Sequence, residues 1–180
     1  MVSNVKTTQK QETQPQLEGL YQEIRDTLGA EKIPNLFTKV GEYEIARWVW
    51  QGFKDIMLRD SSIPRSLKES IALVVSKNNS CGYCVDAHNL MLNAIGYDSN
   101  KIEGLNQDYK SSSHSEKEKT VFDFALKLSN ESYKIIEEDH QILKKHGFTD
   151  QQILEIIAVA SFNNFVNRFV DALGLQFKME

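Results

Sequence analysis

Two cysteines and a histidine lie close together in this sequence, in the run Cys81-Gly82-Tyr83-Cys84 with His88 four residues later. An α-helix turns by about 100° per residue, so Cys84 and His88 lie about 60° and 20° around the helix from Cys81. The three side chains therefore share one narrow helix face. Because the chain has no other cysteine, a disulfide framework is excluded, and the spacing indicates redox chemistry or metal binding in a reducing compartment.

This arrangement offers the means to activate a thiol. The thiolate is the reactive form of cysteine, whose ordinary pKa is about 8.5, so a reactive thiol needs a base or a positive charge beside it. A helix N-terminus supplies partial positive charge at Cys81, whereas His88 lies one turn from Cys84 and can take its proton. The residues alone leave both sulfurs open as the nucleophile. Once one sulfur has attacked a peroxide or a disulfide, the other is close enough to form an intramolecular disulfide.

A carboxylate on the preceding helix completes the group. Glu69 lies about as far before the expected turn as His88 lies after it, so in an antiparallel hairpin the two side chains reach the same level. Paired with the imidazole, Glu69 would orient His88 and raise its basicity. The alternative is a capping box in Ser66-Leu67-Lys68-Glu69, which would give this carboxylate a structural role.

Zinc binding is the rival interpretation of the same residues. Cys81, Cys84 and His88 with one carboxylate have the ligand types that Zn²⁺ prefers. However, the chain lacks a second CxxC or HxxxH motif, and ligands along one helix face close a tetrahedron poorly. We therefore favour redox chemistry of the two thiols, with zinc in a structural or binding module as the alternative.

Composition limits the class of protein. The 180 residues are 41% hydrophobic and 26% charged with a net charge of −4, and no basic tract is present that would neutralise phosphates, so nucleic acid is not an expected partner. Residues 1–16 have almost nothing to bury and predict a disordered tail, leaving 17–180 as a single domain. Without an apolar leader in those residues or an apolar run of about 18 residues, the chain is expected to be cytoplasmic and not associated with membranes.

Apolar spacing is helical throughout, and no stretch alternates with period two, so the expected class is all-α. Ser80 is the expected N-cap of the helix that begins with the CxxC motif, in an antiparallel helical hairpin. Residues 97–114 are expected to form a surface connection with room for a helical turn. The expected helices cover 17–28, 36–59 with a possible break at Gly41, 64–77, 81–95, 116–129, 135–145, 150–160 and 162–173.

At these residues the sequence resembles the alkylhydroperoxidase D (AhpD)-like, or carboxymuconolactone decarboxylase, superfamily. The family pattern is a glutamate, a CxxC motif twelve residues later, and a histidine four residues after the second cysteine, as in Glu69, Cys81, Cys84 and His88. The runs 33–37 and 165–174 are similar to the peroxidase-related branch. The resemblance thus covers about residues 33–175.

The resemblance implies an AhpD-like helical domain that forms homo-oligomers, commonly trimers or hexamers, and a cofactor-free thiol peroxidase activity. It implies that Cys84 attacks a small hydroperoxide, that Cys81 resolves the product, and that Glu69 with His88 relays protons. An unidentified dithiol donor would return the electrons. A thiol-disulfide oxidoreductase using the same cysteines is the alternative enzyme.

Two residues depart from the family pattern. Tyr83 stands where the founding peroxidases have a second histidine, so one station of their proton relay is absent, and Lys68 stands where many relatives have arginine. The decarboxylase branch generally lacks the CxxC pair, which argues against lactone decarboxylation.

Two further sets of residues are unusual for their positions. The last expected helix carries polar side chains between apolar ones, and Asn167 or Arg168 is expected to reach the site if that helix packs on the hairpin. Large aromatic side chains exceed what one small core hides, which predicts a homo-oligomer. The polar set is Asn163, Asn164, Asn167 and Arg168, and the aromatic set is Trp48, Trp50, Phe162, Phe165 and Phe169.

Overall fold

The structure, a computed structural model, describes residues 15–180 as helices joined by short turns. In chain order these are α1 (Pro15–Leu28), α2 (Asn35–Val40), α3 (Glu44–Gly52), the π-helix η1 (Phe53–Leu58), α4 (Arg65–Asn78), α5 (Gly82–Ala94), α6 (Ser99–Gln107), α7 (Glu116–Glu131), the 3₁₀ turn η2 (Ser132–Lys134), α8 (Glu137–Lys145) and α9 (Asp150–Ala172). Within these residues no β-strand is assigned, and the all-α prediction is confirmed. The tail expected over 1–16 falls mainly on residues 1–14, which lie outside the described residues, while 15 and 16 already belong to α1.

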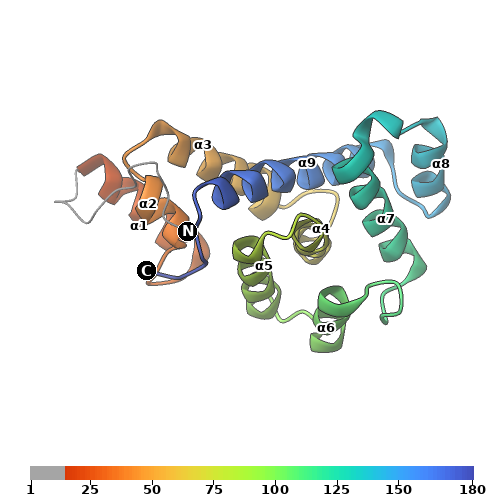
Figure 1. The fold of residues 1–180 in the computed structure, drawn as a ribbon, viewed down its shortest axis with the longest axis horizontal. Coiled ribbons are helices and arrows are strands. Elements are labelled where there is room, and N and C mark those ends of the chain that lie inside the picture. The colour runs from red at the N-terminus through yellow and green to blue at the C-terminus, as the bar shows by residue number, and fades with distance from the viewer. Residues whose placement is uncertain (1–14) are drawn as a thin grey trace.

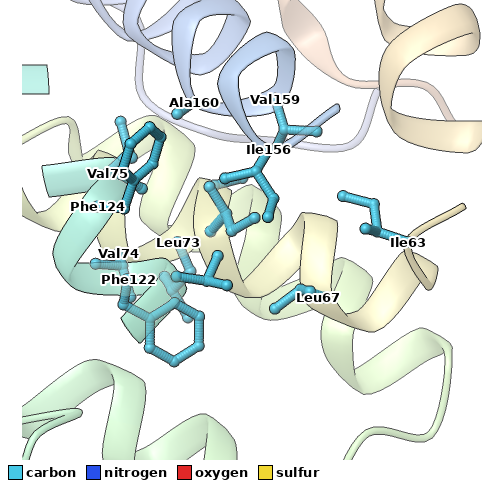
Figure 2. Close-up of a cluster of buried hydrophobic side chains, with 14 of the residues drawn as sticks. Ile63, Leu67, Leu73, Val74, Val75, Phe122, Phe124, Ile156, Val159 and Ala160 are labelled. Carbon is cyan, nitrogen blue, oxygen red and sulfur yellow. The ribbon is translucent and has the colours of Figure 1, made fainter. Parts of the chain in front are cut away.

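The longest helix, α9, runs along the molecule and connects its two ends (Figure 1). Helices α1 to α3 lie at one end and α7 and α8 at the other, with α4 beneath α9 between them. Apolar side chains from α4, α7 and α9 meet in the first core cluster, which Figure 2 shows. A second cluster joins α1 to α3 with the start of α5 and the end of α9, and it contains both cysteines.

Three helices differ from the sequence prediction. The break at Gly41 is present, but the chain beyond α3 continues as a π-helix rather than an α-helix. Residues 99–107, expected in a surface connection, form α6, whose N-cap Asp98 accepts a hydrogen bond from the Lys101 amide. The two helices expected at 150–160 and 162–173 are one helix, because nothing between Ala160 and Phe162 interrupts its hydrogen bonding.

The turn between α4 and α5 also differs from expectation. Ser80 is not the N-cap of α5; it adopts a left-handed conformation with φ 59°, and Cys81 is the N-cap. The Ser80 amide donates to the Lys77 carbonyl and the Cys81 amide to the Ser76 carbonyl, which is the Schellman pattern that ends many helices. One short turn thus ends α4 and starts α5, and it places the cysteines directly beyond the end of α4.

By length and composition, α9 is the one helix of the described residues that would suffice to cross a membrane. Its buried face packs on α4 and α7, however, and the central helix of a soluble protein has the same properties. The described residues form a helical domain.

Candidate active site

The two cysteines lie side by side at the N-terminal end of α5. Cys81 caps the helix and Cys84 lies in its first turn, and their sulfur atoms are 2.8 Å apart, with both thiols free. A sulfenic acid formed on either sulfur would therefore have the other thiol within reach.

A pocket beside the pair distinguishes the two sulfurs. Cys84 and His88 line it, whereas the Cys81 side chain is fully buried and takes no part in its walls. The pocket encloses about 620 Å³, counting the space at its open mouth, and its surface is almost entirely apolar. Its walls include Leu36, Phe37, Trp50, Phe53, Phe162 and Phe177. Of the two cysteines, a compound entering this pocket would therefore meet Cys84 and not Cys81.

The surroundings favour the thiolate at Cys84. A hydrogen bond from the Cys81 thiol holds the pKa of Cys84 below its ordinary value against the effect of burial, and the charge of His88 and a hydrogen bond from Asn167 act in the same direction. At Cys81 the pKa is raised, chiefly because its thiol donates to Cys84 and because it is buried. The directions of these two shifts agree with Cys84, rather than Cys81, as the thiolate.

Glu69 and His88 face each other across the α4–α5 hairpin, as the spacing predicted. Glu69 Oε2 lies 2.7 Å from His88 Nδ1, and Arg65 Nε donates to Glu69 Oε1 at 2.6 Å. Glu69 lies inside α4 and caps nothing, because the N-cap is Pro64 and Ser66 belongs to the helix. The capping-box alternative for this residue was therefore wrong.

Burial and pairing shift the pKa values of this ion pair in opposite directions, and the effect of pairing is the larger. Burial alone would raise the pKa of Glu69, but hydrogen bonds and charges from His88 and Arg65 lower it. Burial alone would lower the pKa of His88, but the hydrogen bond and charge of Glu69, with smaller effects from Cys84 and Asn163, raise it. Both shifts favour the charged forms, a carboxylate and an imidazolium.

Helix α9 contributes asparagines to the site. Asn167 is fully buried, donates to Ser76 Oγ at 3.0 Å, and belongs to the surroundings of Cys84, so the prediction that it reaches the site is confirmed. Arg168 is exposed and instead donates to Asn164 on its own helix. The sequence marked Asn163 as unusually polar for its helix but did not assign it to the site, where its Oδ1 lies 3.0 Å from His88 Nε2.

Tyr83, which replaces a family histidine, fixes the pocket wall. Its hydroxyl oxygen accepts a hydrogen bond from the Leu36 amide at 3.2 Å, and its ring packs edge-on against Phe177 at 5.2 Å between ring centres. Phe177 belongs to the segment after α9, which returns to pair with residues 33–35. Tyr83 thus joins three parts of the chain around the pocket.

Over residues 15–180, no group of three or more His, Cys, Asp or Glu side chains is arranged to hold a metal ion. Cys81, Cys84 and His88 do not form the zinc site considered from the sequence, because the imidazole nitrogens are directed to Glu69 and Asn163.

The family model for the carboxymuconolactone decarboxylase family matches residues 44–106, which contain Glu69, both cysteines and His88. Among curated proteins, the chain is similar to the uncharacterised protein YdfG of Bacillus subtilis, with 27% identity over 76% of this chain and 94% of that protein.

Solved structures share the whole fold. An uncharacterised peroxidase-related protein from Silicibacter sp. TM1040 has 27% identity and a TM-score of 0.84 over 96% of this chain and 92% of its own. A second, described as an alkylhydroperoxidase AhpD core from Ralstonia eutropha JMP134, has 24% identity and a TM-score of 0.86 over 97% and 94%. The debrominase Bmp8, solved as a cysteine-to-alanine variant in complex with 2,3,4-tribromopyrrole, has 24% identity and a TM-score of 0.82 over 99% and 93%. The family match over residues 44–106 and the shared fold support the assignment of the chain to the AhpD-like, or carboxymuconolactone decarboxylase, superfamily.

Proposed function

We propose that the protein is a cofactor-free thiol peroxidase of the alkylhydroperoxidase type, in which Cys84 reduces small apolar hydroperoxides. The observation that carries this proposal is the position of Cys84, which lines an apolar pocket and whose sulfur lies 2.8 Å from that of Cys81, a residue outside the pocket walls. A nucleophilic thiol with a resolving thiol beside it is what peroxide reduction by a CxxC pair requires.

The reaction follows from this geometry. The Cys84 thiolate attacks the outer oxygen of a hydroperoxide, the O–O bond breaks, and the alcohol leaves after taking one proton, so that Cys84 becomes a sulfenic acid. The Cys81 thiol then attacks that sulfur and water leaves, which forms the Cys81–Cys84 disulfide. A dithiol donor reduces the disulfide by exchange and is itself oxidised to a disulfide.

The walls of the pocket indicate which hydroperoxides are preferred. No Lys or Arg side chain lines it, so a carboxylate on the substrate would be desolvated without a partner. The aromatic and aliphatic walls suit an apolar organic group. The expected substrates are uncharged organic hydroperoxides, in a cytoplasmic protein that meets its dithiol donor in a reducing compartment.

Two other activities would use the same cysteines. In the first, the pair is a general thiol-disulfide oxidoreductase. In the second, the thiols remove a halogen from an aromatic compound, which yields the dehalogenated ring, a hydrogen halide and the disulfide. The aromatic walls formed by Phe37, Trp50 and Phe162, together with the shared fold of the debrominase, favour testing the second.

Serine variants of the two cysteines test the proposal, because each is the matched control of the other. Cys84→Ser should abolish consumption of cumene hydroperoxide. Cys81→Ser should reduce one equivalent per chain, accumulate a sulfenic acid that dimedone traps, and then stop. Circular dichroism should show the same helical content in both variants.

Other results would select other functions. Full peroxide turnover by Cys84→Ser, or trapping of the sulfenic acid at Cys81, would contradict the assignment of the nucleophile. A wild-type protein that reduces hydroperoxides no faster than free thiols would contradict the peroxidase, and rapid reduction of a disulfide or of a brominated pyrrole in the same assay would identify the alternative.

A further inference from the structure

The ring of His88 lies between two oxygen atoms. Nδ1 faces Glu69 Oε2 at 2.7 Å, and Nε2 faces Asn163 Oδ1 at 3.0 Å. The orientation of the Asn163 amide is set by its other end, because Nδ2 donates to the Val159 carbonyl at 2.8 Å and also contacts the Met57 sulfur at 3.6 Å. With its nitrogen engaged there, Asn163 presents an acceptor to the histidine.

Two acceptors determine the charge of the ring. A neutral imidazole has one N–H donor and one lone pair, so one of its nitrogens would face an oxygen lone pair without a proton between them. His88 is 6% exposed and Asn163 is 2% exposed, so water does not relieve that repulsion, and an unsatisfied buried polar group is costly. An imidazolium donates to both oxygens and leaves neither nitrogen unsatisfied.

The charges around the ring balance in that state. The charges alternate in sign along a row of four side chains, which are Arg65 (positive), Glu69 (negative), His88 (positive) and the Cys84 thiolate (negative). A neutral His88 with a protonated Cys84 would also have no net charge. The balance between the two protonation states therefore depends on which of them makes the better hydrogen bonds. The Asn163 oxygen favours the state with the imidazolium.

We propose that Asn163 is a positioning residue that holds His88 as a doubly protonated imidazolium, so that His88 stabilises the Cys84 thiolate and supplies the proton when the O–O bond breaks. This inference rests on the proposed peroxidase. When the O–O bond breaks, the alkoxide is a stronger acceptor than the amide oxygen and takes the Nε2 proton, which gives the alcohol and neutral His88. The proton returns when the dithiol donor reduces the disulfide, because the Cys84 thiol then transfers its proton to His88.

Three variants of this asparagine and its neighbour test the proposal by nuclear magnetic resonance of the histidine ring nitrogens in the reduced protein. Of the four histidines, the His88 signals are those that disappear in His88→Gln. The wild type should show both His88 nitrogens protonated at pH 7. Asn163→Leu removes the acceptor and should lower the pH of His88 titration by about one unit or more, the size expected for one lost hydrogen bond to a charged group. The ultraviolet absorbance of the Cys84 thiolate should then appear at correspondingly higher pH.

Asn163→Asp separates positioning from general disruption. It also loses the donor to Val159, but it keeps an oxygen toward Nε2, so His88 should stay protonated to at least the wild-type pH. Asn164→Leu is the matched control on the same helix, since Asn164 bonds Ser129 and not His88, and it should leave the His88 titration unchanged.

An unprotonated Nε2 in the wild type at pH 7, or the same His88 titration in Asn163→Leu as in the wild type, would overturn the proposal. Equal downward shifts in Asn163→Leu and Asn163→Asp would also overturn it, because the acceptor would then not be the cause. These measurements need no turnover, so they remain informative if the protein reduces no hydroperoxide.

Discussion

At the scale of single residues, the reactivity of Cys84 depends on a buried chain of charges that begins at the surface. Arg65 is 28% exposed and pairs with Glu69, which is fully buried and pairs with His88. Taking Glu69 out of water is costly and is offset only because its two oxygens have separate cationic partners. The carboxylate thus links a solvated arginine to the imidazole beside the reactive thiol.

Replacing Glu69 by glutamine should therefore destabilise the fold in a pH-dependent way. The raised pKa of His88 contributes stability that is complete below the unfolded histidine pKa and is lost as the pH rises through the folded value. The lowered pKa of Glu69 contributes stability that is complete above its unfolded pKa and is lost as the pH falls through the folded value. The pair contributes most between about pH 5 and 6.5.

In that window Glu69→Gln should cost about 3–5 kcal/mol of unfolding free energy, as when one partner of a buried ion pair is removed. The loss should become smaller at higher pH, where His88 becomes neutral and glutamine can bond it. Denaturant titrations at several pH values measure this, with Glu103→Gln, an exposed carboxylate on α6, as control. A loss that does not depend on pH would show that the pair is not ionised.

The sequence predicted the four central residues because helical spacing and one short turn determine their relative positions. These residues lie within twenty positions on two helices, so local geometry suffices to bring them together; they are Glu69, Cys81, Cys84 and His88. Asn163 lies 75 residues from His88, and only tertiary packing of α9 brings it there. Its signal in the sequence is an amide on an otherwise apolar helix face, which does not identify the partner.

At the scale of elements, the α4–α5 turn determines where the cysteines stand. Ser80 occupies the position that is usually glycine in a Schellman motif, with φ 59°. A side chain in the left-handed region costs roughly 1–2 kcal/mol, which the packing of the two helices must offset. The sequence suggested Ser80 as an N-cap because serine is common at that position, and its residue type gives no sign of the left-handed conformation.

Ser80→Gly should consequently stabilise the protein by about 0.5–1 kcal/mol, since relief of the left-handed strain exceeds the added flexibility of glycine in the unfolded chain. Ser80→Val should destabilise it, because a β-branched side chain is least tolerated there. Thermal unfolding measures both. Ser115→Gly is the control, because Ser115 is a true N-cap with a capping box on α7 and a few tenths of a kcal/mol should be lost. Destabilisation by Ser80→Gly would show that the serine side chain has a stabilising contact.

The missed α6 and the unbroken α9 have related causes. Residues 97–114 are polar and contain several serines, which favour turns locally, but Ile102 and Leu105 pack on α4 and a capped helix buries them. In α9 two helices were expected where the structure has one, and Asn163 and Asn167, unusually polar for a helix, have buried partners outside the backbone ladder. In both segments tertiary contacts outweigh local propensity.

At the scale of the whole molecule, the aromatic residues that suggested an oligomer divide into two groups. Trp50 is 2% exposed and belongs to the pocket and core, packed against Phe37, so it is not part of an outer face. Trp48, on the same helix, is 78% exposed, and Phe165 on α9 is 47% exposed and stacked on Phe169. Two neighbouring tryptophan positions thus have opposite environments, which the helical period explains.

We predict that the protein is a homo-oligomer, a trimer or hexamer, that covers these exposed rings, because large aromatic side chains in water are unfavourable and are typical of interfaces. Trp48→Asp should then shift the species seen by light scattering coupled to size exclusion toward the 20.6 kDa monomer while circular dichroism stays unchanged. Trp50→Asp is the contrasting variant, since a charge at a buried position should unfold the domain itself. A wild type that is already monomeric at micromolar concentration would refute the assembly. An oligomer that Trp48→Asp leaves intact would place its interface elsewhere, and Phe165→Asp would then test the face of α9.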